Sequence, residues 1–145
     1  MSTLYELALK GLGEREQYAH IVQQYLNTYT ETKIEKDTND EGLVIFNNLM
    51  TIYFDEELMD FDYYKKSYGF DAEIVLNIYF FTERYETGVD VLLQLAAYLE
   101  TLGVEYLFEE GSLIFRKENG KLDISLRMKD NQYYLNEETI RRFLK

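Results

Sequence analysis

A nine-residue run with almost no polar side chain limits most strongly what this chain can fold into. Residues 73–81 read Glu-Ile-Val-Leu-Asn-Ile-Tyr-Phe-Phe and are rich in β-branched and aromatic side chains, which favour strands. A strand that is apolar on both faces is typical of a central position in a sheet that other elements cover on both sides. The run therefore predicts a central strand of a covered sheet.

Two longer segments have the periodicity of helices. Apolar side chains recur at i, i+3, i+4 and i+7 between residues 14 and 29, which predicts an amphipathic helix. A second helix is expected from Thr87, as its N-cap, to Gly103, as its C-terminal cap. A short helix with Asn136 as its N-cap, and with Ile140, Phe143 and Leu144 facing inward, closes the chain.

The remaining segments favour strands that pair with their neighbours in the sequence. Residues 5–10 alternate apolar and polar side chains, which favours an edge strand, with a short helix as the alternative. Asn119-Gly120 predicts a two-residue hairpin turn, because both residues tolerate positive φ. The pairs expected from this turn are Glu118 with Lys121, Arg116 with Asp123, Phe115 with Ile124 and Leu113 with Leu126. Further strands are expected at residues 32–36, 43–46, 50–54 and 105–108.

Most links between these strands are too short for parallel crossovers, so neighbouring strands should be antiparallel. The fold class predicted is α+β: a mainly antiparallel β-sheet packed against two main helices and a short C-terminal helix. At 145 residues, the chain is expected to form a single α+β domain over residues 1–145.

The charge and composition exclude several classes of partner. A formal net charge of −12 repels phosphate backbones and anionic lipids, so we expect neither nucleic-acid nor membrane binding. No apolar run approaches the ~18 residues of a membrane span, and the N-terminus lacks a signal-peptide pattern. The chain has no cysteine, which suits a reducing compartment. We therefore expect a cytoplasmic location. The acidic surface has an alternative explanation, since many soluble domains are acidic merely for solubility.

Acidic and aromatic side chains are concentrated in residues 55–64, which we expect to form a loop. Five carboxylates lie within the eight residues 55–62, and their mutual repulsion would be relieved by a basic partner. Exposed aromatic side chains among charges are typical anchors of protein interfaces. The alternative is that Phe61 and one tyrosine merely hold this segment against the sheet. The predicted partner-binding residues are Asp55, Glu56, Glu57, Asp60, Phe61, Asp62, Tyr63 and Tyr64.

Catalytic groups are few. The single histidine, His20, is expected to be an ordinary surface residue, and no cysteine is present to act as a nucleophile. Asp60-Phe61-Asp62 is the nearest approach to a metal-binding pattern, but it lacks the glycine and the distal glutamate of a calcium loop. Phosphate-binding glycine motifs are absent. We therefore predict no catalytic residue, no metal site and no cofactor. The alternative is a small acid/base or metal-dependent hydrolase that uses Asp55, Glu57, Asp60 or Asp62.

Several tyrosines lie at positions where a helix or strand needs core material. Packing in the core is therefore the expectation for Tyr18, Tyr25, Tyr53, Tyr79 and Tyr98.

The order of these elements resembles the Sit-type immunity proteins of polymorphic toxin systems. The resemblance covers most of the chain. It lies in residues 5–9, in Tyr68-Gly69-Phe70 with the following run 73–81, in Leu92-Leu93-Gln94-Leu95, and in residues 113–116 with their Asn119-Gly120 hairpin. Such proteins are small cytoplasmic inhibitors that protect bacteria from toxins delivered by their neighbours. They have no catalytic residues.

The resemblance implies that this chain binds a cognate toxin domain and blocks it. The acidic surface would fit a basic toxin such as a nuclease. Residues 55–64 would meet a basic groove, and reversal of Asp60 and Asp62 to lysine should slow association several-fold. A structural adaptor that has no toxin as a partner is a third possibility.

Overall fold

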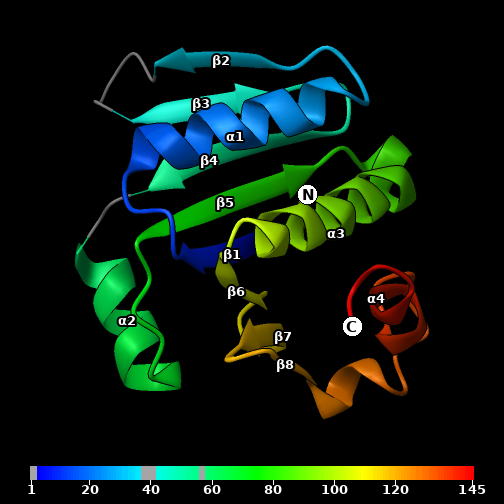
Figure 1. The fold of residues 1–145 in the computed structure, drawn as a ribbon. Coiled ribbons are helices and arrows are strands. Elements are labelled where there is room, and N and C mark those ends of the chain that lie inside the picture. Colours follow the sequence, from blue (N-terminus) through cyan, green and yellow to red (C-terminus); the bar gives the residue numbers. More distant parts are fainter. Residues whose placement is uncertain (1–2, 37–41, 56–57) are drawn as a thin grey trace.

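The computed structural model describes residues 3–36, 42–55 and 58–145. This part of the chain contains one sheet of eight strands in the order β2-β3-β4-β5-β1-β6-β7-β8 (Figure 1). The strands are β1 (Leu4–Lys10), β2 (Lys33–Lys36), β3 (Leu43–Phe46), β4 (Met50–Asp55), β5 (Ile74–Phe80), β6 (Glu105–Glu109), β7 (Leu113–Glu118) and β8 (Lys121–Ile124). Every pair of neighbouring strands is antiparallel, so the predicted α+β fold with an antiparallel sheet is confirmed.

Helices alternate with groups of strands in the described part of the chain. They are α1 (Arg15–Asn27), α2 (Leu58–Tyr68), α3 (Tyr85–Thr101) and α4 (Glu137–Phe143), with short 3-10 helices η1 (Thr82–Arg84) and η2 (Leu126–Met128). In the described residues, no helix combines the length and the apolar character that a membrane span requires.

The central strand is β5, as predicted, and it lies between β4 and β1. The expectation that the first strand lies at an edge is wrong, because β1 pairs with both β5 and β6. After β1, the chain crosses through α1 to the outer strand β2 and returns strand by strand to β5. After α3, the strands from β6 onward extend the sheet on the other side of β1. The first strand thus becomes central because later strands add to both of its edges.

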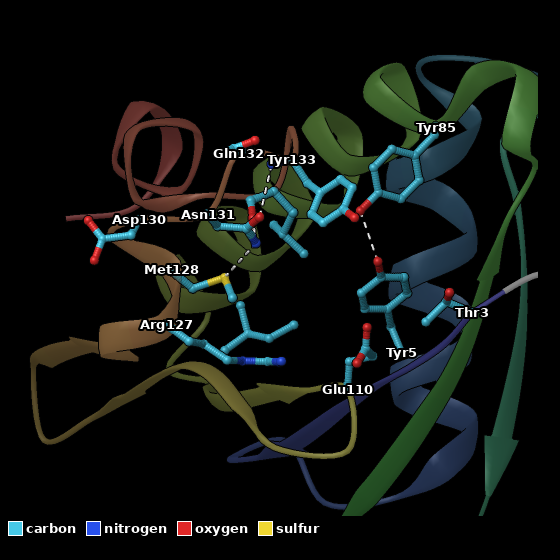
Figure 2. Close-up of a pocket in the computed structure, with 12 residues that line it drawn as sticks. Thr3, Tyr5, Tyr85, Glu110, Arg127, Met128, Asp130, Asn131, Gln132 and Tyr133 are labelled. Atoms are coloured by element: carbon cyan, nitrogen blue, oxygen red, sulfur yellow. Dashed lines mark hydrogen bonds between the residues drawn. The ribbon is translucent and has the colours of Figure 1, made fainter.

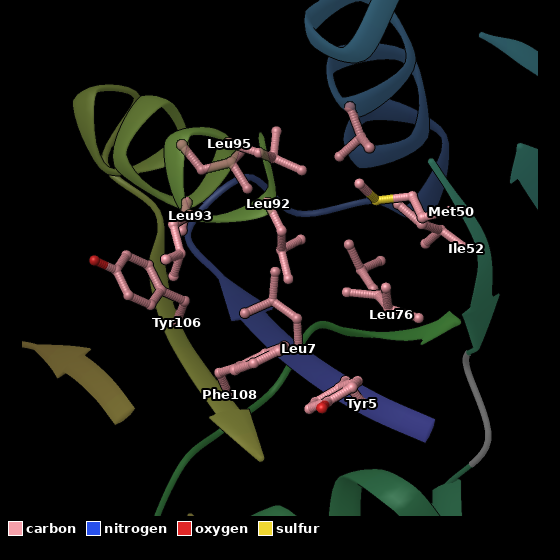
Figure 3. Packing of buried hydrophobic residues seen from close by; sticks show 14 of the residues in the cluster. Tyr5, Leu7, Met50, Ile52, Leu76, Leu92, Leu93, Leu95, Tyr106 and Phe108 are labelled. Carbon is pink, nitrogen blue, oxygen red and sulfur yellow. The ribbon is translucent and has the colours of Figure 1, made fainter. Parts of the chain in front are cut away.

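The main core lies between one face of the sheet and the helices α1 and α3, which Figure 1 shows lying across that face. Figure 3 shows Leu7 of β1 and Phe108 of β6 below Leu92 of α3, with Met50 and Ile52 nearer to α1. All five side chains are at most 2% exposed. The amphipathic pattern of residues 14–29 is confirmed, with Tyr18, Ala19, Val22 and Leu26 buried under α1.

Only the C-terminal end of α3 agrees with the prediction. Thr87 is not the N-cap, because η1 precedes the helix and α3 already begins at Tyr85. At the other end, Gly103 has φ +87°, as a C-terminal cap requires. Its N–H donates to Glu100 O and that of Val104 donates to Leu99 O, which is the paired bonding of a Schellman motif.

The predicted hairpin is present, with Asn119 at φ 54° and Gly120 at φ 78°. Glu118 pairs with Lys121, Arg116 with Asp123 and Phe115 with Ile124, as predicted. The pairing of Leu113 with Leu126 is wrong, because the chain turns at Ser125 into η2 and leaves Leu126 76% exposed. Met128 of η2 enters the core instead.

The C-terminal helix forms as expected. Asn136 Oδ1 accepts a hydrogen bond from the Thr139 N–H at 2.9 Å, so Asn136 is the N-cap of α4. Ile140 and Leu144 are buried, and Phe143 packs against the core while remaining partly exposed.

The acidic and aromatic segment differs from the prediction. Residues 58–68 form the helix α2, not a loop. Phe61, Tyr64 and Tyr68 are spaced i, i+3 and i+7, so the helix places them on one side, toward the sheet. Charged residues between these aromatics hide this apolar stripe in the sequence.

Candidate partner-binding surface

Helix α2 packs on the face of the sheet opposite to α1 and α3. Its contacts form a second, smaller core of Tyr64 and Phe70 with Ala8, Val75 and Leu107. The three sheet residues alternate along their strands with residues of the main core, which places them on the other face. Phe61 and Tyr68 pack at the border of this second core.

The C-terminal end of α2 is held in place by hydrogen bonds and charge. Gly69 has φ +64°, and its N–H donates to Lys65 O at 2.9 Å, which closes the last turn. Arg116 Nη1 donates to the backbone oxygen of Tyr68 at 3.0 Å, where the helix dipole favours a positive charge. Lys10 Nζ lies 4.5 Å from the centre of the Phe70 ring and also forms an ion pair with Glu118.

Two carboxylates lie side by side under α2. Glu6 and Glu109 are direct partners on β1 and β6, an arrangement that is unfavourable for like charges unless other groups compensate it. Tyr63 and Tyr68 donate to Glu109 Oε2 at 2.9 and 2.7 Å. Tyr64 donates to Glu6 Oε1 at 3.2 Å and lies 3.5 Å from Glu109 Oε1. The three tyrosine hydroxyls of α2 thus donate hydrogen bonds to the two carboxylates that lie side by side on the sheet.

The tyrosines remain donors near neutral pH. Burial raises the pKa of Tyr64, and the charges of Glu109 and Glu6 raise it further. The pKa of Tyr68 is raised by burial and by its hydrogen bond to Glu109. Burial also raises the pKa of Tyr63, although its hydrogen bond with Tyr68 acts in the opposite direction. Each hydroxyl therefore keeps its proton and its bond to a carboxylate.

The aromatic residues of the predicted site differ in their exposure to solvent. Tyr64 is fully buried and cannot serve as an exposed anchor, because its ring forms the centre of the second core. Phe61 is only partly exposed and packs against the same core. Tyr63 is 39% exposed, so it is the aromatic residue of residues 61–64 that faces solvent. The alternative interpretation, in which Phe61 and one tyrosine hold the segment on the sheet, describes these two residues.

Asp60 and Asp62, the acidic residues of the predicted site whose side chains the structure describes, do not converge either. Asp62 is exposed on α2, whereas Asp60 is partly buried, and side chains two positions apart on a helix point in different directions. Asp55 is the last residue of β4, where its backbone pairs with Val75. Glu56 and Glu57 lie outside the described residues. The Nζ atom of the exposed Lys65 lies 3.8 Å from Oδ1 of Asp71, a residue that follows the end of the helix.

Several apolar side chains on the second face of the sheet remain exposed among the described residues, a feature that the sequence did not indicate. Leu4 and Tyr53 remain 37% and 42% exposed, and Tyr79 is partly exposed beside them. The rings of Tyr53 and Tyr79 meet edge to face, with centroids 6.0 Å apart. The expectation that Tyr53 lies in the core is therefore wrong, because its side chain alternates away from the buried Ile52 and Phe54. Tyr98 is also exposed, at 38%, and its ring stacks on that of Tyr25 of α1 with centroids 4.7 Å apart, whereas Tyr18 is buried as expected.

A cleft of about 900 Å³ lies between β1, α3 and the segment that follows η2. Figure 2 shows the hydroxyls of Tyr5 and Tyr85 meeting at its side, where they hydrogen bond at 2.9 Å. The Arg127 and Glu110 side chains point toward one another below them. This lining offers one cation, two carboxylates and three phenols, but no nucleophile with an adjacent base.

His20 is exposed on α1, as expected of a surface histidine. Within residues 3–36, 42–55 and 58–145, no group of three or more histidine, aspartate or glutamate side chains is placed to hold a metal ion. Comparison of the chain with protein-family models, with curated proteins and with solved structures gave no match.

Proposed function

We propose that this chain is an immunity protein that binds a cognate toxin domain and blocks it, the toxin being basic, such as a nuclease. The proposal is supported by the exposed side of α2, where Asp62 is exposed beside Lys65 and Lys66 and the Tyr63 ring is 39% exposed, on a helix whose inward side is anchored. A partner that binds there does not need to order a loop, so little conformational entropy is lost on binding.

Charge supports the same conclusion. The chain carries 27 acidic and 15 basic side chains, so a positively charged protein is attracted from a distance and its association is accelerated. Tyrosine is enriched among the residues that contribute most to protein interfaces. The resemblance of the chain to Sit-type immunity proteins adds the kind of partner, a toxin domain that acts inside the cell.

The test uses the toxin domain encoded by the gene beside that of this chain. Cells that express this domain should survive when they also produce the wild-type chain, and the purified pair should associate faster as the salt concentration falls. Asp62→Lys should slow association several-fold without changing urea unfolding, because it reverses a charge on the exposed side of α2.

Asp130→Lys is the matched control, since it makes the same change of charge at an exposed aspartate beside the cleft. Equal rates for the two variants would show that α2 has no local role. Failure of the wild-type chain to bind the toxin domain and to protect the cells would contradict the proposed function. Calorimetric titration with magnesium, calcium and manganese addresses the hydrolase alternative, which stoichiometric binding of one of these ions would favour.

A further inference from the structure

The second face of the sheet presents apolar side chains that are not part of the small core under α2, and these lie on four adjacent strands. We name this set the open sheet surface: Leu4, Val44, Phe46, Tyr53 and Tyr79. Their alternation with Ile45, Ile52, Ile78 and Tyr5, which belong to the main core, places all five on the second face.

The strand register makes this surface continuous. Phe46 of β3 pairs with Thr51 of β4, Thr51 with Tyr79 of β5, and Tyr79 with Leu4 of β1. In the next row, Val44 pairs with Tyr53. Side chains that are direct partners on one face of a sheet lie within contact distance, so these residues form one patch. Contiguous exposed apolar surface of this kind marks interaction sites in monomeric proteins.

The row that contains Tyr53 connects the open sheet surface to α2. Tyr53 pairs with Asn77, and Asn77 pairs with Glu6, which accepts the hydrogen bond from Tyr64 of the helix. Tyr63, on the solvent side of the same helix, is anchored through Glu109, the partner of Glu6. The strand residues beneath α2 are thus continuous with the open sheet surface.

Charge decides between the two simplest occupants of this surface. A second copy of the chain would bring together two molecules that each carry a net charge of −12, which opposes association. A positively charged protein is attracted instead, and arginine side chains stack well on the faces of tyrosine rings. Tyr53 and Tyr79 offer such rings in an edge-to-face pair that is already formed.

Resting on the proposed function, we propose that the open sheet surface is the apolar centre of the toxin-binding interface. It takes a positively charged protein surface whose arginines stack on Tyr53 and Tyr79, while α2, which exposes Asp62 together with Lys65 and Lys66, lies at its border. The interface would therefore be centred on the strands, outside the segment 55–64 that the sequence indicates.

The experiment measures binding of the wild-type chain and its variants to the purified toxin domain encoded by the adjacent gene. The variant Tyr53→Thr/Tyr79→Thr keeps β-forming residues in both strands and removes both rings. It should weaken binding by about tenfold or more, as expected for residues at the centre of an interface. Leu4→Arg, at an exposed position that needs no repacking, should weaken binding by repelling the positively charged partner.

Tyr98→Ala is the matched control, because Tyr98 is similarly exposed but lies on α3, which packs on the opposite face of the sheet. It should change the dissociation constant by less than about threefold. If wild type binds and the double variant and Leu4→Arg bind equally well, the surface is wrongly assigned and the proposed function stands. If wild type itself does not bind, the proposed function fails. A wild-type dimer in sedimentation that Leu4→Arg dissociates would overturn the choice of occupant.

Discussion

Glu73, just before β5, accepts four hydrogen bonds on one carboxylate oxygen. Oε1 lies 2.7 Å from the N of Gly11, 3.2 Å from that of Leu12, 2.9 Å from that of Gly13 and 2.5 Å from the hydroxyl of Tyr18. These bonds tie the turn after β1 and the first part of α1 to the start of the central strand. Replacement of this carboxylate should therefore weaken the junction of three elements.

The size of the stability loss depends on which of these donors can form a hydrogen bond with water once the carboxylate is gone. The three backbone N–H groups lie near the surface and gain water if the carboxylate is lost, so each contributes little. The Tyr18 side chain is fully buried, and a hydrogen bond to a charged group contributes about 1.5–3 kcal/mol. We expect Glu73→Gln to lower the free energy of unfolding by about 2 kcal/mol. For a domain of this size, that corresponds to a decrease in Tm of about 4–8 °C.

The pH dependence gives a second readout. Burial raises the pKa of Glu73, but the hydrogen bonds from Tyr18 and from the Gly13, Gly11 and Leu12 N–H groups outweigh it, so the pKa lies below its ordinary value of 4.5. A lowered pKa in the folded state stabilises the protein above the unfolded pKa, and this contribution is lost as the pH falls through the folded pKa. The difference between wild type and Glu73→Gln should therefore shrink as the pH falls below about 4.5.

The assay is urea unfolding followed by far-ultraviolet circular dichroism, at pH 7 and at pH 3.5. Glu83→Gln is the control, since Glu83 is exposed in η1 and the same change there should alter stability by less than about 0.5 kcal/mol. The reasoning is refuted if Glu73→Gln costs no more than this control. It is also refuted if the cost of Glu73→Gln stays the same at both pH values.

Two further substitutions test the packing of the main core. Gly88→Ala should lower the unfolding free energy by about 1–3 kcal/mol in urea, because the new Cβ would lie 2.8 Å from Phe80 Cδ1; an unchanged midpoint would contradict this close contact. Tyr106→Phe should leave thermal stability unchanged or raise it by up to about 1 kcal/mol, since the buried Tyr106 hydroxyl has no hydrogen-bond partner among the described residues; a clear loss of stability would reveal a partner for it.

The features that were predictable from the sequence are those that neighbouring residues determine. The Asn119-Gly120 turn needs positive φ at both positions, and this local requirement also sets the register of β7 and β8. The stripe of α1 and the cap at Asn136 are similarly local. The segment 58–68 was also readable in principle, because Phe61, Tyr64 and Tyr68 have helical spacing, but its charge density favoured a loop.

The candidate surface was not predictable in the same way. Whether Tyr53 is buried or exposed depends on which face of β4 the helices cover, and alternation alone does not name that face. Glu109 reads as part of a turn in the sequence, yet it is 2% exposed and accepts hydrogen bonds from tyrosines more than 40 residues away. No local pattern marks such a residue.

Local patterns in the chain were enough to predict the strongest helices and strands, the antiparallel pairing of neighbouring strands and the acidic charge of the surface. The central position of β1, the packing of α2 on the second face and the three tyrosine donors shared by Glu6 and Glu109 arise from contacts between distant segments. The physical reason is the range of the interactions. Turns, caps and helix faces depend on residues a few positions apart, whereas these contacts join segments such as Tyr64 and Glu109, 45 residues apart in the chain.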